Sequence, residues 1–220
     1  GSGYRHEYIN EYAREWEYRD SSGYSMPHNP EALEVIYNLR SKNSISSNHL
    51  ELYAQDTWRK EIKSGVFSLN YGLRLSYWSW NKEWLCSPRA SLTFIPKNHN
   101  NMTFRLASGL YYQRPFYKEL RDTTTIGRTT IVELNRNIQS QRSIHVIAGY
   151  ELRFKLSKRP FLFSTELYYK GQDRLNPYTV DNTKLVYYGR NCATGNVMGI
   201  DLKLYGEFVP GTDSWLTFSL

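Results

Sequence analysis

Hydrophobic and polar residues alternate one by one along most of the chain, which is the pattern of β-strands. In the clearest run one face carries Phe67, Leu69, Tyr71, Leu73, Leu75 and Tyr77, and the other carries Ser68, Asn70, Gly72, Arg74, Ser76 and Trp78. We expect about nine strands and no helix of core size. The predicted strands cover residues 4–19, 49–59, 66–81, 88–96, 102–113, 143–155, 161–170, 198–208 and 216–220.

Several of these runs reach about ten residues, the length that a tilted strand needs to cross a membrane. Strands of water-soluble proteins are usually about five or six residues long. The connections also alternate in length. Short ones cover 60–65, 97–100, 157–160 and 210–213; longer ones cover 20–48, 114–137 and 171–196, and 79–87 is intermediate. Short turns at one rim and long loops at the other predict an all-β, antiparallel up-and-down transmembrane β-barrel.

Aromatic residues sort to the two ends of the predicted strands. Phe67, Phe94, Phe104, Phe154, Phe161 and Phe208 fall near the short-turn rim, and Tyr77, Tyr112 and Tyr169 fall near the other. Two aromatic girdles are expected where a barrel meets the two interfaces of a membrane. Aromatic residues favour strands in general, but that preference does not separate Phe from Tyr.

The cost of burying charge decides which face looks outward. A Lys or Arg in the middle of the lipid face costs about 2–4 kcal/mol. A register slip of one residue would move four cations into lipid together. These cations are Arg74, Arg105, Arg153 and Lys203. We therefore expect the apolar faces to meet lipid and the charged faces to meet a watery or plugged lumen.

Composition changes this picture little. The chain has 28 Lys and Arg against 21 Asp and Glu, and the cations are scattered without a run or a nucleic-acid motif, so we expect no nucleic-acid partner. A mean hydropathy of −0.63 is compatible with a barrel, because half of each strand faces water. No stretch approaches the roughly 18 apolar residues of a spanning helix.

No residues with recognisable catalytic spacing stand out. The five histidines have no metal-ligand spacing to one another or to Cys86 and Cys192, so a structural or solvated role is favoured. No nucleophile elbow, phosphate-binding loop or zinc-protease helix occurs. We therefore expect no catalytic residue, no metal site and no cofactor, and a protein that is not an enzyme. Glu7, Glu11, Glu15 and Glu17, beside Arg5 and Arg19, favour a wetted lumen wall over an acid–base pair.

Two features leave alternatives open. Cys86 and Cys192 both fall in connections at the long-loop rim, where they are either bridged or two separate thiols. The connection 114–137 contains Phe116, Tyr117, Lys118, Glu119 and Arg121. These residues could contact a glycan, peptide or chelate, or could belong to an ordinary loop with its own small core. No ligand-binding residue is assigned.

Short motifs in a fixed order resemble a known family. They are Leu52-Tyr53-Ala54-Gln55-Asp56-Thr57-Trp58-Arg59, Asn70-Tyr71-Gly72-Leu73-Arg74, Ser87-Pro88-Arg89-Ala90-Ser91 and Gly199-Ile200-Asp201-Leu202-Lys203. They resemble the barrel of TonB-dependent outer-membrane receptors, over nearly the whole chain. The resemblance implies a barrel of about 22 strands around a plug, a bacterial outer-membrane location and active nutrient uptake driven by an inner-membrane complex.

In that interpretation residues 1–220 are part of one transmembrane barrel domain, and the plug domain and the remaining strands are absent from it. The implied partners are outer-membrane lipid, the TonB complex through the missing plug region, an unknown nutrient ligand and a surface lipoprotein. Alternatives are a porin or adhesin barrel, a soluble all-β module that binds a ligand such as a glycan, and a barrel-embedded hydrolase. On its own the chain would expose unpaired strand edges and a broad apolar face, so we expect it to need detergent, pair with itself or rearrange.

Overall fold

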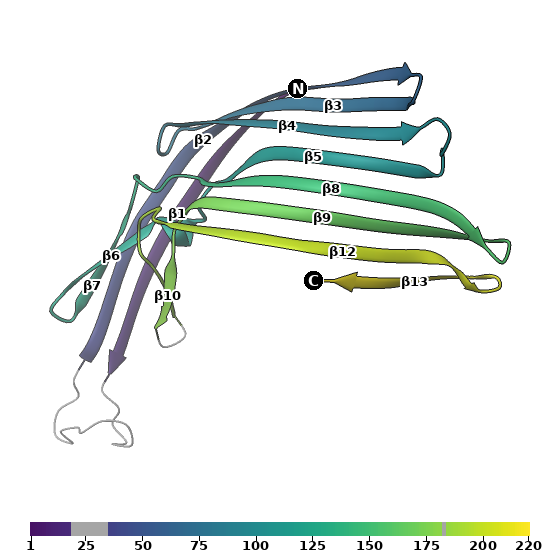
Figure 1. The fold of residues 1–220 in the computed structure, drawn as a ribbon. Coiled ribbons are helices and arrows are strands. Elements are labelled where there is room, and N and C mark those ends of the chain that lie inside the picture. The colour runs from purple at the N-terminus through teal and green to yellow at the C-terminus, as the bar shows by residue number, and fades with distance from the viewer. Residues whose placement is uncertain (19–34, 182–183) are drawn as a thin grey trace.

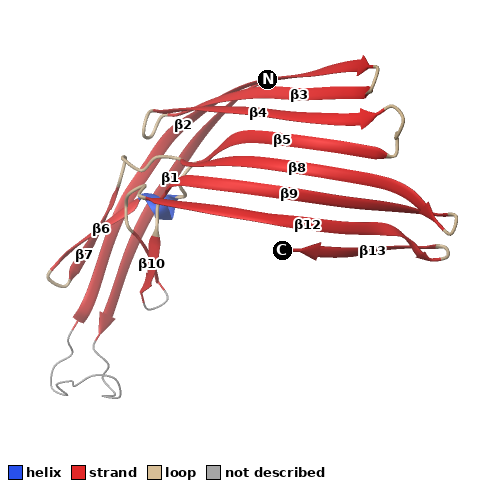
Figure 2. Ribbon diagram, in the orientation of Figure 1, coloured by secondary structure: helices blue, strands red, loops and turns tan. Residues whose placement is uncertain are grey.

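The computed structural model describes residues 1–18, 35–181 and 184–220, and strands dominate them (Figures 1 and 2). Nine long strands are β1 (Ser2–Tyr18), β2 (Val35–Ile62), β3 (Gly65–Trp78), β4 (Glu83–Pro96), β5 (Met102–Gln113), β8 (Gln141–Leu156), β9 (Arg159–Leu175), β12 (Ala193–Val209) and β13 (Thr212–Ser219). The connections add a single 3-10 turn, η1 (Tyr117–Leu120), and four short strands, β6 (Arg121–Ile126), β7 (Thr129–Leu134), β10 (Tyr178–Asp181) and β11 (Lys184–Tyr187). Within the described ranges no helix is long and apolar enough to cross a membrane.

The long strands form one curled sheet in the order β13-β12-β9-β8-β5-β4-β3-β2, with β1 paired to β2. Each of these pairs is antiparallel, and each new strand lies beside the one before it. Figure 1 shows this open, curved wall. The prediction of an antiparallel, up-and-down partial barrel is therefore confirmed.

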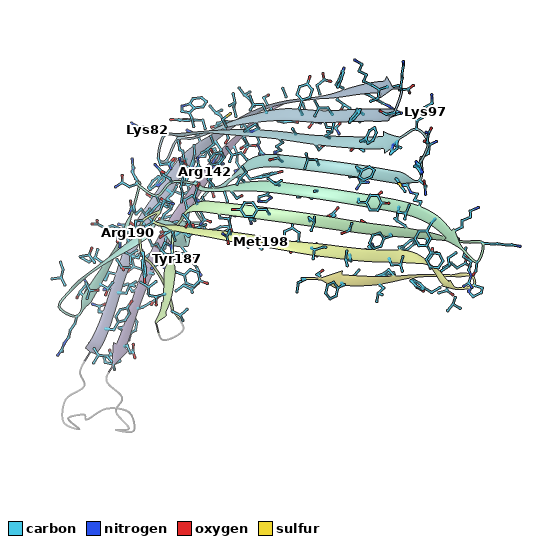
Figure 3. All side chains as sticks on the ribbon, in the orientation of Figure 1. Lys82, Lys97, Arg142, Tyr187, Arg190 and Met198 are labelled. Atoms are coloured by element: carbon cyan, nitrogen blue, oxygen red, sulfur yellow. The ribbon has the colours of Figure 1, made fainter. Side chains whose placement is uncertain are left out.

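Apart from the short β3–β4 turn, the connections sort by length to opposite ends of the sheet, as predicted. The tight turns β2–β3, β4–β5, β8–β9 and β12–β13 lie at one end, on the right of Figure 1, and the long connections lie at the other. Lys82 and Lys97, which flank β4, mark these two ends in Figure 3. We call the two ends the short-turn rim and the long-loop rim.

The two faces of the sheet differ in the predicted way. Along β3, Leu73 is 43% exposed on the face that also carries Leu52 of β2 and Leu106 of β5, and we call this the outer face. Arg74 lies on the opposite, inner face. The outer face keeps its large apolar side chains uncovered, which suits contact with lipid and not with a water-soluble core.

Aromatic rings form a continuous band at the short-turn rim of the outer face. Phe67 stacks on Phe94 with centroids 4.5 Å apart, and Phe94 lies 6.4 Å from Phe104. A second group joins Phe154, Phe161 and Phe208 at 5.7 and 5.2 Å. At the long-loop rim the predicted Tyr77 packs 4.8 Å from Trp84. At the short-turn rim Tyr150 packs on Phe104 and extends the Phe band. The sequence pattern did not predict Trp84 or Tyr150 as members of these bands. The bands have the arrangement expected of interfacial girdles.

Strand β1 begins within two residues of the predicted start, whereas β2 extends much further than predicted. β2 has 28 residues, and β1 pairs with its first half from Tyr18↔Val35 to Ser2↔Leu52. Much of the connection expected at 20–48 is therefore strand. The first half of β2 has serines on both faces, so the hydrophobic alternation is weak there. Loops that pack on its inner face bury Leu39, Ser41, Ile45 and Ser47. β1 and the first half of β2 form a hairpin that projects beyond the long-loop rim (Figure 1).

Other boundaries also differ. β4 begins at Glu83, so the link expected at 79–87 shrinks to a short turn, and Cys86 lies within a strand. The connection expected at 114–137 contains the β6–β7 hairpin, and β7 runs parallel to residues 38–41 of β2. The connection expected at 171–196 contains the β10–β11 hairpin. These short strands pair within their own connections, and only β7 also pairs with a distant segment, so four to six residues of alternation give too weak a signal to predict them.

Candidate functional site

The connection between β5 and β8 folds back over the inner face at the long-loop rim. Its residues Leu120 and Ile138 join Ile45 of β2 and the two tryptophans Trp78 and Trp80 in the principal buried apolar cluster of the described chain. Burying these side chains against the wall offsets the entropy of ordering a long connection. The loop is thus packed on the barrel wall instead of extending into solvent.

His49 fixes this loop to the strands below it. Its ring is 3% exposed and stacks on Trp78 with centroids 6.0 Å apart. Arg114 can only donate, so its hydrogen bond to Nδ1 makes that nitrogen the acceptor, and Nε2–H then donates to Glu7 over 2.9 Å. Burial, followed by the charge of Arg114, lowers the pKa of His49. The neutral imidazole therefore links the loop to β1.

A second link forms around Glu11 on β1. Its carboxylate accepts hydrogen bonds from the Tyr117 hydroxyl and, over 2.7 Å, from Ser41, while Arg121 lies 3.7 Å away. Burial alone would raise the pKa of Glu11, but these two hydrogen bonds and the charge of Arg121 lower it. Burial and the same carboxylate raise the pKa of Tyr117. The pair is stable as ionised Glu11 and neutral Tyr117.

Glu83, at the start of β4, holds the far end of the same connection. Its carboxylate accepts the backbone N–H of Ser140 at 3.0 Å, the Ser140 hydroxyl at 2.6 Å and the amide of Asn81 at 3.2 Å. Arg174 lies 3.8 Å away and has a positive φ of 55°, at an irregularity where β9 pairs with β12. A bulge of this kind re-aims a side chain, here toward Glu83.

The β9–β12 connection interlocks with the first. The amide of Asn191 donates to the Gln139 carbonyl at 3.0 Å, and Asn135 donates to the Gly189 carbonyl at 3.0 Å. Asn176 donates to the carbonyl of Glu119 at 3.2 Å, and burial raises the pKa of the Glu119 carboxyl. Arg190 and Tyr187, labelled in Figure 3, come from this connection. The β5–β8 and β9–β12 connections thus make one framework above the inner wall.

Below the framework, the inner wall carries a second arrangement of charged and aromatic residues. Arg74 pairs with Glu51, which also lies 3.7 Å from Arg114. Arg89 lies over the Tyr111 ring at 5.1 Å, and that ring packs 4.6 Å from His145. Two open hollows of about 230 and about 420 Å³ adjoin along Arg89. This wall offers cations, hydroxyls and amides to a bound ligand, and among described residues no set of three or more His, Cys, Asp and Glu is placed to hold a metal.

The predicted site residues fall into three groups. Glu7 and Glu11 lie on the inner face as expected. Glu7 accepts a hydrogen bond from His49 of β2, Glu11 contacts the folded loop, and Glu15 and Glu17 are exposed. Arg5 lies on the same face, 4.0 Å from Glu7. Arg19 and His28, one of the five histidines, lie outside the described residues. The described members of this set thus lie on a wetted face, except that the folded loop partly covers Glu11.

The structure answers the two questions that the sequence leaves open, on the cysteines and on the connection 114–137. Cys86 and Cys192 are free and exposed. In the connection 114–137, Tyr117, Glu119 and Leu120 pack into the protein, whereas Phe116 and Lys118 are exposed. These contacts correspond to a loop with its own core. Arg89, Tyr111 and His145, which converge on the inner wall, were not singled out, because only strand register brings these distant residues together.

The comparisons with known proteins agree with this geometry. The family model described as "TonB dependent receptor-like, beta-barrel" matches residues 1–220, the whole chain. The chain belongs to the TonB-dependent receptor barrel family. No curated protein matches it significantly. Members of this family are transporters and not enzymes, and the family implies a bacterial outer-membrane setting. The outer apolar face and the two aromatic bands of the described strands are what that setting requires.

Proposed function

We propose that this chain is part of an outer-membrane receptor that takes up a nutrient actively, and that it supplies barrel wall and outer vestibule. The observation that carries the proposal is the loop framework: the β5–β8 and β9–β12 connections are tied to each other and to the inner wall by hydrogen bonds. A passive channel needs a clear entrance, whereas a receptor needs a shaped vestibule that first holds its ligand.

The strand edges support the remaining part of the proposal. β1 pairs with β2 as far as Leu52, and Gly1 adds two hydrogen bonds to the backbone of Tyr53. Beyond that point, the β2 edge at residues 54–62 that faces away from β3 has no partner strand in the described chain. β13 forms the opposite edge of the sheet. A membrane strand with an open edge is unstable in lipid. We propose that further strands of the same protein close the barrel, and that a plug domain fills it and engages TonB.

The outer surface suits the other proposed partners. Exposed apolar residues between the two aromatic bands would contact outer-membrane lipid. Beyond the long-loop rim, β1 presents the exposed aromatic residues Tyr8, Tyr12 and Trp16. A surface lipoprotein seated over this rim would cover such residues. The ligand itself is a nutrient that diffuses through porins too slowly to meet the needs of the cell.

The test is uptake in cells that lack the gene for the receptor containing this chain. Growth would be compared on single sources of iron chelate, vitamin or oligosaccharide, with and without a plasmid-borne copy. We expect at least one source to support growth only with the copy, and its uptake to stop when a protonophore removes the energy source of TonB. Uptake that continues unchanged with the protonophore would refute an energised receptor.

A further inference from the structure

The strand register places a row of cations on the inner wall below the loop framework. Gly72↔Arg89, Arg89↔Gly109, Gly109↔His145 and His145↔Lys170 are successive cross-strand partners, so one level of the wall runs from β3 to β9. Arg74 follows one step closer to the long-loop rim. We call Arg74, Arg89 and Lys170 the cationic belt. Neighbouring strands lie about 4.8 Å apart, so Arg89 and Lys170 are separated by about 14 Å along the wall.

The belt has a defined geometry at Gly109. An added Cβ there would lie 2.9 Å from the Tyr111 hydroxyl oxygen and ring carbon, so the tyrosine ring lies directly over the glycine. The same ring carries Arg89 at 5.1 Å and packs against His145 at 4.6 Å. A guanidinium held over an aromatic ring keeps its N–H donors free for an anion. Gly109 and Tyr111 therefore position Arg89.

Charge on this level of the wall is unbalanced. Arg74 is matched by Glu51, but neither Arg89 nor Lys170 forms an ion pair with any residue in the described ranges. The nearest inner-face carboxylates toward the short-turn rim are Glu166 and its cross-strand partner Asp201, two levels away, and beyond them Glu151 pairs with Arg105 at 2.9 Å. A concave wall with one sign of charge focuses its field and attracts ligands of the opposite sign.

Room for a ligand lies beside the same residues. The two hollows of about 230 and about 420 Å³ share Gln55, Gly72 and Arg89. The larger one is also lined by Thr57, Asn70 and Ser91, whose hydroxyl and amide groups can donate or accept hydrogen bonds. Small-molecule sites combine such space with a few convergent polar groups.

We infer that the cationic belt binds a soluble ligand that carries several negative charges along its length, such as an acidic oligosaccharide, with Arg89 as the principal contact. This inference rests on the proposed uptake function and specifies the chemical class of the nutrient. A ligand with a single charge would engage only Arg89, whereas anionic groups about 14 Å apart engage Arg89 and Lys170 together.

The test measures binding to the purified full-length receptor in detergent. The probes are tetra-galacturonate, with one carboxylate on each ring, and maltotetraose, which has the same number of rings and no charge. We expect the acid to bind at least about tenfold more tightly than the neutral sugar, because only the acid forms charge-assisted hydrogen bonds. Arg89→Gln should weaken its binding about tenfold and Lys170→Gln about threefold.

Lys97→Gln is the matched control, since it removes one exposed positive charge at the short-turn rim and should leave binding unchanged. Equal binding of both probes, no binding of tetra-galacturonate, or an Arg89→Gln receptor that binds it as well as the wild type would each overturn the inference. Failure of the uptake proposal is separate: it appears as growth that does not depend on the gene or on membrane energy.

Discussion

At the scale of single residues, neighbouring side chains on one strand meet opposite environments. Leu73 is on the outer face with 43% of its surface exposed, and Arg74 pairs with Glu51 on the inner face. Leu73 faces lipid and Arg74 faces the lumen, because exchanging the two side chains would place a charge in lipid. Sequence alternation alone is enough to assign both.

Leu73→Arg in the full receptor should therefore impair membrane assembly strongly, by about 2–4 kcal/mol if the residue lies near mid-membrane. Arg74→Leu should be milder, because it removes a partly exposed ion pair that contributes about 1 kcal/mol or less. Heat-modifiable mobility of the folded barrel on gels measures the folded fraction. Equal folding yields for the two variants would contradict the assignment of the faces.

The Glu11–Tyr117 link makes the loop sensitive to acid. Because hydrogen bonds and Arg121 lower the pKa of Glu11 in the folded loop, the stabilisation is present above the ordinary value of 4.5 and is lost as the pH falls through the lowered value. Tyr117→Phe should remove much of it at neutral pH, about 1.5 kcal/mol for a hydrogen bond to a charged acceptor.

Loop mobility can be followed with a spin label on Lys118→Cys, an exposed position on η1, after Cys86 and Cys192 have been replaced by serine. We expect the wild-type label to become mobile only in acid, and the Tyr117→Phe label to be more mobile already at pH 7. A spectrum that is identical in both proteins at both pH values would show that Glu11 does not hold the loop.

At the scale of elements, alternation in the sequence predicts the strands that have one face in lipid. It does not predict strand segments that are buried by long loops. The spanning strands alternate because one side meets lipid and the other meets polar groups, so the pattern predicts β3, β5 and β8 with nearly correct limits. The first half of β2 has serines on both faces, so its sequence predicts a connection instead of a strand. Its inner face is buried because residues far along the chain fold onto it. Such a long-range contact cannot be predicted from the alternation of neighbouring residues.

The same limit applies to the candidate site. The sequence showed that Arg74 faces the lumen, since it lies within a clean alternation. It did not show that Arg89, Tyr111 and His145 meet, because their contact depends on how β4, β5 and β8 are aligned. Alignment of neighbouring strands is set by turns and by contacts across the sheet, which are not visible in any one strand.

Two turns at the short-turn rim give opposite predictions. Ser157 and Lys158, between β8 and β9, both have positive φ, at 52° and 66°, which two-residue hairpins require and which favours Asn-Gly. Lys158→Gly should stabilise the barrel by about 1 kcal/mol. Gly211, between β12 and β13, has φ of 75°, and Gly211→Ala should destabilise it by a similar amount. Barrel melting temperatures, read from gel mobility, should move in opposite directions; shifts of the same sign would count against these turn geometries.

At the scale of the whole molecule, the sheet is stable only with other surfaces around it. Its outer face keeps large apolar side chains exposed, and its edges at residues 54–62 of β2 and along β13 have no partner in the described chain. The buried apolar cluster lies under the loops, not between two sheets. Lipid on one face and further strands at both edges would supply what is missing.

Residues 1–220 expressed alone should therefore sediment from detergent-free buffer and remain dispersed in detergent. The apolar outer face drives association in water, and the open edges allow strands of different copies to pair. Charged substitutions on the outer face, such as Leu106→Lys with Leu167→Lys, should increase solubility, whereas the same change at the inner-face residue Ile147 should have less effect, since that face is already polar. Analytical ultracentrifugation measures the association state in each buffer. A detergent-free monomer with a cooperative melting transition would show that the exposed apolar face does not contact lipid, and would contradict the assignment of a membrane wall.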